Sequence, residues 1–390
     1  MSAVPASLRV ANQAQVLEAL LGLGAASRAE LAKSTGMSQP TAGKIVDELL
    51  AAAVLEEVSA DALRAASVGR PGKQLRLARG QSRFVLIELG VERTRVLAAP
   101  IAPLDEERWD AEFKTPTSEA AWLRALRQHT ERLELYQPLG VVVSAPGVID
   151  EKAGRILLSP NLHWTERAEL PERLQELFGA PVLLLQEIAV LSLGELAGRR
   201  SETDFLLVDV GEGVGGSVVL GGRPYQGPLP VRGEIGHTPI PGNTRACGCG
   251  GQGCMETLIA EPGLLRSFRA QSRRPNADFE ELKQKLEKSK LPRWLCEALD
   301  ATAMCLVAAL NLYGLGRVVL TGLIGELGAP AREYLKAAVE HSALWSRFES
   351  VSVEYAPRHR ARGLGLSAFQ RIVLPGDWAL ARLAERASLV

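Results

Sequence analysis

Three cysteines and one histidine are spaced closely enough along the chain to hold a metal ion. Cys247, Cys249 and Cys254 fall within eight residues, and His237 lies ten positions before the first of them. The residues between the cysteines are mostly glycine, which permits the sharp turns needed to bring the ligands together. Three thiolates and one imidazole match the closed tetrahedral set of a structural zinc site. We therefore expect Zn²⁺ here; the alternative is three unrelated buried thiols.

The composition limits what the rest of the chain can be. With 390 residues, 46% of them hydrophobic, the chain suits two or three globular units. Residues 1–80 carry nine Lys/Arg against seven Asp/Glu, an excess of +2 that leaves −2 for the remainder, so charge alone does not indicate nucleic acid. No apolar run approaches bilayer-spanning length, and the N-terminus does not have the pattern of a signal peptide. We expect a cytoplasmic protein with no membrane partner, and we expect Cys296 and Cys305 in its core.

The first eighty residues predict three short helices. Residues 12–23 have an apolar face, and Ser27 with Glu30 forms a capping box that begins a second helix. Gly36 permits the left-handed turn that ends this helix, and Ser38 begins the third. Helix, tight glycine turn and helix is the spacing of a DNA-binding helix-turn-helix. The alternative is a small three-helix packing module.

Polar residues at the start of the third helix are candidates for contacts in a DNA major groove. These short polar side chains and one cation suit base edges and phosphates. They are Ser38, Gln39, Thr41 and Lys44. Residues 54–58 and 73–77 predict a two-stranded wing, and Arg70 at its tip is placed to enter a minor groove.

From residue 82 onwards, short apolar segments alternate with helical patterns. We expect strands at 84–89, 139–144, 182–186, 205–210 and 317–321. We expect helices at 118–133, 170–178, 189–198 and 293–313. A strand, a glycine turn and a second strand recur about 120 residues apart, at Gly90 and Gly211. This alternation indicates an α/β fold with a largely buried sheet.

The segment around the cysteines resembles the signature of the ROK family (repressors, open reading frames and sugar kinases). It reads Gly233-Glu234-Ile235-Gly236-His237 and then Cys247-Gly-Cys-Gly-Gly-Gln-Gly-Cys254-Met-Glu256. Segments 144–150, 161–164, 193–195 and 318–322 also look like ROK segments, in the family's order. The resemblance implies a two-lobed actin-like ATPase fold, here preceded by a winged helix-turn-helix similar to that of the family's repressor branch. The expected domains are residues 1–80, 81–200 and 201–390.

The same resemblance implies a sugar site in the cleft between the lobes. In the family, the residues equivalent to Glu234, His237 and Glu256 face the sugar, and Asn161, Gln186 and Glu187 complete the expected ligand set. Carboxylates accept bidentate hydrogen bonds from vicinal hydroxyls, and a metal-bound imidazole is held in one orientation. The alternative for the two signature glutamates is a solvated or salt-bridged surface role.

Several departures from the kinase pattern indicate that phosphoryl transfer has been lost. ROK kinases carry Asn-Asp where this chain has Gln186-Glu187, and their Asp is the general base. The extra methylene of Glu187 displaces the carboxylate, which general-base geometry tolerates poorly. Glu92 and Glu212 place carboxylates in loops that would cradle phosphate, where like charges oppose nucleotide binding. We therefore expect no catalytic residue and no ATP.

Together these features predict a transcriptional repressor of sugar-metabolism genes. Its partners would be double-stranded operator DNA, a sugar or sugar-phosphate effector, and further copies of itself as a dimer or tetramer. One alternative is a ROK-family sugar kinase with an appended DNA-binding domain. Another is a DNA-binding scaffold that no longer binds a ligand.

Overall fold

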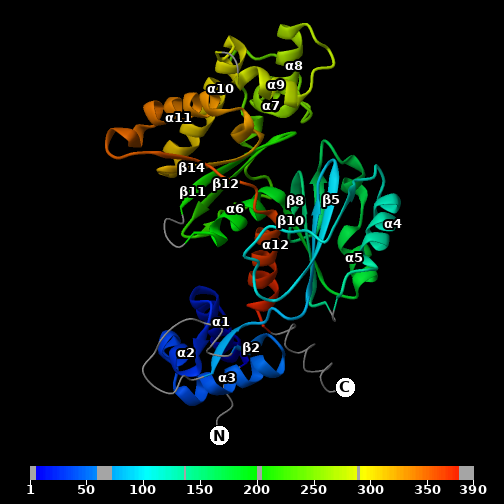
Figure 1. Ribbon diagram of the computed structural model, residues 1–390, viewed down its shortest axis with the longest axis vertical. Helices are drawn as coiled ribbons and strands as arrows, with labels where there is room; N and C mark the ends of the chain where they lie inside the picture. The colour runs from blue at the N-terminus through cyan, green and yellow to red at the C-terminus, as the bar shows by residue number, and fades with distance from the viewer. Residues whose placement is uncertain (1–5, 59–72, 136–137, 200–203, 288–289, 377–390) are drawn as a thin grey trace. The chain divides into compact units, whose positions relative to one another are not determined.

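The chain folds as two compact units, each made of segments that are distant in sequence. The computed structural model describes all residues except 1–5, 59–72, 136–137, 200–203, 288–289 and 377–390 (Figure 1). The first unit contains residues 1–145, 168–185 and 361–390, and the second contains 146–167 and 186–360. The expected ranges 81–200 and 201–390 are each continuous, whereas these units are not, because the chain passes between them after residues 145, 167, 185 and 360.

The first unit begins with a small module of three helices and a three-stranded sheet. The helices are α1 (Ala6–Leu23), α2 (Arg28–Thr35) and α3 (Gln39–Ala51). The strands, in spatial order, are β1 (Ala26–Ser27), β3 (Gln74–Leu77) and β2 (Leu55–Val58). The last two are the strands predicted for the wing, paired antiparallel. Strand β1 was not predicted because two residues carry no periodic signal.

Local chemistry sets the ends of these helices, as predicted. The Ser27 hydroxyl accepts the backbone N–H of Glu30 at 3.3 Å, and the Ser27 N–H donates to the Glu30 carboxylate at 2.7 Å, forming the capping box. Gly36 ends α2 with a φ of +70°, a conformation that disfavours residues with a Cβ atom. Ser38 then caps α3.

The rest of the first unit is built on a five-stranded sheet. Its spatial order is β10 (Val182–Gln186), β7 (Gly140–Ala145), β4 (Phe84–Leu89), β5 (Arg93–Ala99) and β6 (Ala111–Lys114). Helices α4 (Glu119–Thr130), α5 (Leu170–Phe178) and most of α12 (Arg360–Ala368) belong to the same unit. All six residues of β4 and of β7 are buried, which explains why their apolar runs were continuous in the sequence.

The second unit contains a sheet with the same strand order. This order is β13 (Arg223–Pro224), β12 (Val214–Leu220), β11 (Phe205–Val210), β14 (Arg317–Gly322) and β15 (Ser352–Tyr355). Counted along the chain, the first strand of each sheet (β4 or β11) pairs antiparallel with the second (β5 or β12) and parallel with the fourth (β7 or β14). The turns noted at Gly90 and Gly211 are thus the first hairpin of each sheet.

Helices cover the two faces of this second sheet unequally. Leu206, Val208 and Val210 share a core with α7 (Glu256–Ile259), α8 (Glu261–Ser272), α9 (Phe279–Glu287), α10 (Arg293–Tyr313) and α11 (Ala329–Ser342). The alternate residues Phe205 and Leu207 instead pack against α6 (Glu187–Ala197). Side chains of a strand alternate between faces, so a continuous apolar run serves both cores. A short hairpin, β8 (Val148–Asp150) and β9 (Arg155–Leu158), completes the unit.

Helix α10 corrects two expectations drawn from the sequence. It is long and apolar enough to cross a membrane by length and composition, although no run of that kind was expected. Half of its apolar window is buried inside the protein, and a buried core helix passes the same test, so this is weak support for a membrane span. Cys305 on this helix is buried as predicted, whereas Cys296 is only partly buried.

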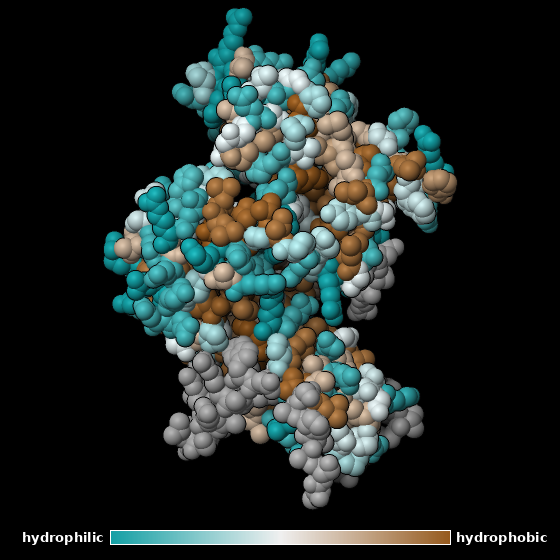
Figure 2. Space-filling model, turned by 180° about the vertical axis from the view of Figure 1, so that it is seen from behind, coloured by the Kyte–Doolittle hydropathy of each residue, from teal (hydrophilic) through white to brown (hydrophobic). Residues whose placement is uncertain are grey.

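Some hydrophobic side chains of the second unit remain on its surface. Leu312 at the end of α10 is 79% exposed, and Phe348 is 75% exposed. Trp345 lies beside Phe348, with ring centroids 5.8 Å apart, and against Gly316. Hydrophobic residues also lie between hydrophilic ones on the face of the molecule drawn in Figure 2. Such exposed groups are common on proteins, but clustered ones are typical of association surfaces.

The capping box gives a first prediction. Replacing Ser27 with Ala removes one of its two hydrogen bonds and is expected to cost about 1 kcal/mol of local stability. Backbone amides of α2 should then exchange with deuterium about fivefold faster. The control is Ser34→Ala, which removes an exposed hydroxyl of the same helix. Equal exchange in the two variants would contradict the role of the cap.

Candidate functional site

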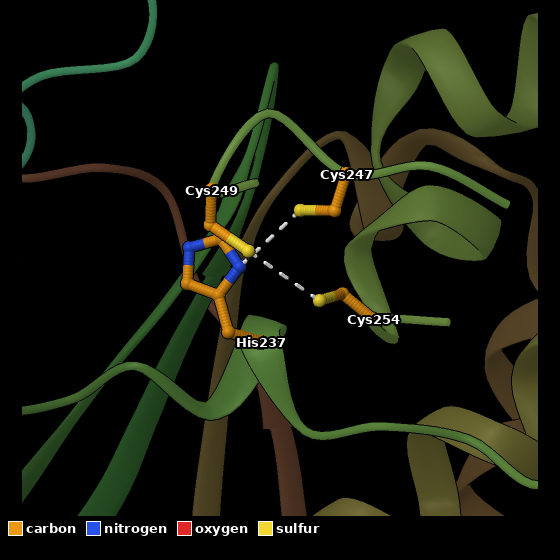
Figure 3. Close-up of side chains that lie close together, drawn as sticks. All are labelled: His237, Cys247, Cys249 and Cys254. Carbon is orange, nitrogen blue, oxygen red and sulfur yellow. Dashed lines mark hydrogen bonds between the residues drawn. The ribbon is translucent and has the colours of Figure 1, made fainter. Parts of the chain in front are cut away.

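The four candidate metal ligands converge in the second unit. His237 ends the short helix η3 (Ile235–His237), and the three cysteines lie in the loop before α7. One ligand atom from each residue lies within 4.8 Å of every other. Cys249 Sγ is 3.8 Å from Cys254 Sγ, and Cys247 Sγ is 3.5 Å from His237 Nδ1 (Figure 3).

These distances fit a tetrahedral zinc ion. Zinc–sulfur bonds of about 2.3 Å at tetrahedral angles place two sulfurs about 3.8 Å apart, and a nitrogen ligand slightly closer to a sulfur. The measured separations agree with both values. The donor set is closed, so a metal held here would have a structural role. The proximity of these side chains therefore supports the metal site predicted from the sequence.

The loop that carries the cysteines is shaped by its own backbone. Cys247 N–H donates to the Gly251 carbonyl at 2.9 Å, and Gly253 N–H donates to the Arg245 carbonyl at 2.8 Å. Gly253 has a φ of +76°, and a Cβ atom there would lie 2.6 Å from the Asn243 carbonyl oxygen. Glycine is thus required at this position, and the ligands are directed by the fold of the loop.

The protonation of the thiols also favours a bound cation. Burial raises the pKa of the Cys247 and Cys254 thiols, whereas the backbone N–H of Gly251 lowers the pKa of Cys249. Three thiols this close cannot all ionise without a compensating positive charge. A divalent metal would supply that charge and take up the thiolates.

Two glutamates flank the histidine. His237 Nε2 is 3.6 Å from Glu234 Oε2, and His237 Nδ1 is 3.6 Å from Glu256 Oε1. Burial raises the pKa of Glu234, the charge of His237 opposes this rise, and the nearby Glu256 adds to it. With Nδ1 directed at the cysteines, Nε2–H faces Glu234, an arrangement common around metal-bound histidines. The structure thus brings together the three signature residues predicted to face a sugar.

Gln186 and Glu187 lie at the junction of β10 and α6. Helix α6 begins at Glu187, two residues before the predicted start. Gln186 is buried; its Nε2 donates to the Arg232 carbonyl at 3.3 Å, while its Oε1 has no hydrogen-bond partner among the described residues. A buried amide oxygen in this state is an acceptor that a ligand hydroxyl would satisfy.

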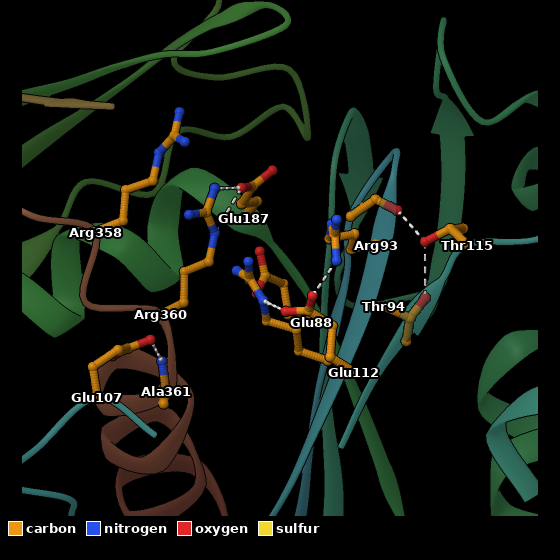
Figure 4. A network of polar contacts seen from close by, with 12 residues as sticks. Glu88, Arg93, Thr94, Glu107, Glu112, Thr115, Glu187, Arg358, Arg360 and Ala361 are labelled. Atoms are coloured by element: carbon orange, nitrogen blue, oxygen red, sulfur yellow. Dashed lines mark hydrogen bonds and ion pairs between the residues drawn. The ribbon is translucent and has the colours of Figure 1, made fainter. Parts of the chain in front are cut away.

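Glu187 has a partner that the sequence did not reveal. Its Oε1 accepts hydrogen bonds from Nε of Arg360 at 3.1 Å and from Nη2 of the same guanidinium (Figure 4). The Arg360 side chain is 11% exposed and that of Glu187 is 26% exposed. The carboxylate predicted at the base position is therefore engaged in an ion pair.

Asn161 comes from a turn outside the segments that carry the other candidate ligand residues. It is exposed in the turn after β9, and within the described part of the chain no hydrogen bond joins it to the other predicted ligand residues. Pro160, which precedes Asn161, lies against the cysteine loop: a Cβ atom on Gly248 would be 3.6 Å from its ring.

A second, largely buried ion pair was also missed from the sequence. Asp209 at the end of β11 accepts Arg358 Nε at 2.6 Å, Arg358 Nη2 at 2.9 Å and the Thr321 hydroxyl at 2.7 Å. Burial by itself would raise the pKa of Asp209, but the charge of Arg358 holds that pKa below its usual value. Alternating arginines at 358, 360 and 362 were the available signal.

The acidic residues of the two predicted phosphate loops differ in their surroundings. Glu88 is buried on β4, and Arg95 donates to its carboxylate at 3.1 Å. Glu92 and Glu212 are both exposed. That they would face a nucleotide stays a prediction.

The predicted DNA contacts lie at the start of α3. Ser38, Gln39, Thr41 and Lys44 are all exposed. The Ser38 and Thr41 hydroxyls lie 2.8 Å apart, so Ser38 also has the structural role of capping the helix. Arg70 lies outside the described residues.

Comparison with known proteins identifies the family. Residues 87–366 match the ROK family, and the chain belongs to it, as its signature predicted. It is 28% identical to a putative xylose repressor of Caldicellulosiruptor sp. (strain Rt8B.4), with 67% of this chain and 66% of that protein covered. It is 23% identical to the xylose repressor of Caldicellulosiruptor bescii, with 93% and 95% covered.

Two solved structures show the fold. A ROK family transcriptional regulator, described as a homolog of the E. coli MLC protein, superposes with a TM-score of 0.77 at 18% identity, covering 97% of this chain and 99% of that one. A ROK hexokinase from Thermus thermophilus gives 0.60 at 25% identity, covering 73% and 96%. The α/β fold of this family, predicted from the sequence, is thereby confirmed.

The metal site gives the second prediction. Cys254→Ser removes one thiolate, so zinc content measured by mass spectrometry should fall from about one ion per chain to near zero. The thermal midpoint should fall by roughly 5–10 °C, because the metal cross-links the loop. Cys296→Ser, a cysteine of α10 outside the cluster, is the control and should keep its zinc. A Cys254→Ser protein that retained full zinc would contradict the site.

Proposed function

We propose that this protein is a DNA-binding transcriptional repressor of sugar-metabolism genes, controlled by a sugar or sugar-phosphate effector. The observation that carries the proposal is a module of three short helices, with exposed polar residues at the start of α3, joined in one chain to a ROK domain. The similarity to xylose repressors over most of the chain supports the same interpretation.

The DNA-binding half of the proposal rests on residues 1–80. Helix α3 would enter the major groove with Gln39 and Lys44 directed at bases and phosphates, and the strands β2 and β3 would form a wing. Arg70 would enter the minor groove from the wing tip. The protein would bind as a dimer or tetramer, because helix-turn-helix proteins commonly bind two-fold sites. The exposed apolar residues near Phe348 offer surface for such association.

The effector half rests on the cluster around His237. Glu234 and Glu256 would accept hydrogen bonds from sugar hydroxyls, and so would the Gln186 amide oxygen, which has no partner among the described residues. Zinc would hold the imidazole in a fixed orientation beside them. For the effector to release DNA, ligand and operator must favour different arrangements of the protein.

We further propose that the ROK domain does not transfer phosphate. A general base must be free to take a proton from the substrate hydroxyl. Glu187 instead shares its carboxylate with the guanidinium of Arg360. The ion pair therefore supports the loss of phosphoryl transfer more directly than the exchange of Asp for Glu does.

The DNA-binding half can be tested with double-stranded sites selected in vitro from random sequence. Lys44→Ala should weaken binding to all selected sites and reduce the slope of log affinity against log salt by about 0.9, the value for one lost phosphate contact. Arg70→Ala should weaken binding most at A/T-rich positions. Lys152→Ala, an exposed cation of the second unit, is the control. Failure to retain any specific DNA at physiological salt would contradict the repressor proposal.

The effector site can be tested by thermal shift with a panel of sugars and sugar phosphates. A bound ligand raises the midpoint by mass action. Glu234→Gln should weaken binding of the active sugar about tenfold, because a hydrogen bond to a carboxylate is lost. Glu349→Gln, an exposed acid of the same unit, should bind as the unmodified protein does. A panel with no active sugar would favour the ligand-free scaffold.

The second candidate function is a sugar kinase with an appended DNA-binding domain. The likeness to the Thermus thermophilus hexokinase favours it. A coupled assay of ATP consumption distinguishes the two: sugar-dependent turnover would overturn the proposed loss of phosphoryl transfer, and its absence with an active effector would exclude the kinase.

A further inference from the structure

The guanidinium of Arg358 occupies the turn at the carboxyl ends of β11 and β14. Arg358 follows β15 and lies two residues before the second unit ends. Besides its two bonds to Asp209, Nη2 donates to the Val210 carbonyl at 3.0 Å. The arginine thus binds both a side chain and the backbone where β11 ends.

Two glycines make room for this guanidinium. A Cβ atom on Gly211 would lie 2.7 Å from Arg358 Nη2, and a Cβ atom on Gly322 would lie 2.4 Å from the same nitrogen. Gly322 has a φ of +80°, so two constraints favour glycine there. The space beside both glycines is therefore filled by a side chain of the protein itself.

In a kinase of this fold the same place would belong to a nucleotide. Glycine-rich turns can bind phosphate through their backbone N–H groups. Residues 211–216 correspond to the second phosphate loop in the ROK resemblance. Here Gly211 N–H already donates to the Gly213 carbonyl at 2.9 Å. With this N–H engaged and the guanidinium of Arg358 filling the space beside the turn, the residues present do not fit a nucleotide phosphate.

Asp209 is a further reason why a nucleotide does not fit this turn. Its side chain is only 13% exposed, and the charge of Arg358 holds the pKa of the carboxyl below its usual value. A buried carboxylate without a cation is costly, so a nucleotide could not displace Arg358 without leaving this charge uncompensated. Arg358 and Asp209 neutralise each other's charge, so neither side chain needs a ligand for this.

We propose that Arg358 is a built-in substitute for the nucleotide. It fills the phosphate end of the former nucleotide site and neutralises Asp209, so the second sheet keeps its arrangement without ATP. This deepens the proposed loss of phosphoryl transfer and rests on it. In this proposal nucleotide is excluded by the guanidinium of Arg358, which lies against the glycine turn, in addition to the acidic residues Glu92 and Glu212.

Thermal shift and titration calorimetry with MgADP test this inference on the full chain. The unmodified protein should show no change with millimolar MgADP. Arg358→Ala opens the glycine turn but leaves Asp209 unpaired, so the double variant Asp209→Asn/Arg358→Ala is made alongside it. At least one of the two should gain a rise of roughly 5 °C or more at about 100 times its Kd.

The matched control is Arg199→Ala. Arg199 is also a partly buried arginine of the second unit, paired with Glu195 and Glu354, but it lies outside the glycine turn. It should lose stability without gaining a response to MgADP. A response of the unmodified protein equal to that of the opened variants would overturn the proposal, as would no response in either opened variant. Neither result depends on DNA, so the repressor proposal stands or falls separately by its operator assay.

Discussion

The convergence of His237 with three thiols is the constraint around which the candidate site is arranged. Cys249 and Cys254 approach to 3.8 Å only because the loop between them turns through glycines in left-handed or crowded positions. The same convergence directs the imidazole towards Glu234 on one side and Glu256 on the other. A structural metal can thus orient residues that would contact a ligand without contacting the ligand itself.

The segment after β15 forms two ion pairs within the second unit. Arg358 binds Asp209 and Arg360 binds Glu187, and each arginine is mostly buried. Buried pairs of this kind add little net stability, because desolvation offsets most of their attraction. Their effect is specific: each commits a carboxylate of the second unit to a fixed arginine partner.

The two sheets share a strand arrangement and a pattern of charge pairing. Both have an antiparallel hairpin, and in both a parallel strand pairs with the other edge of the first hairpin strand. In the first sheet the strand ends carry Glu88, bound by Arg95; in the second they carry Asp209, bound by Arg358. At each position an acidic residue follows the same topological rule, and in each case an arginine of the same unit neutralises it.

The sequence by itself determined features that depend on neighbours along the chain. The capping box at Ser27, the turn at Gly36 and the helix 293–313 follow from local hydrogen bonding, backbone freedom and periodicity, and the structure has all three. The metal ligands were also predictable, because three of them lie within eight residues. Strands β6 and β15 were missed, since a short, half-exposed strand is stabilised mainly by the strand it pairs with.

Only the tertiary structure decided which charges meet. Arg360 and Glu187 are 173 positions apart in the chain, and Arg358 and Asp209 are 149 apart, so nothing local records either pair. The same holds for the division into units, because the chain crosses between them after Arg360, the first residue of helix α12. Sequence patterns report hydrogen bonds and periodicities that close within a few residues. Long-range electrostatic partners depend on how sheets bring distant strand ends together, and that information appears only when the chain is folded.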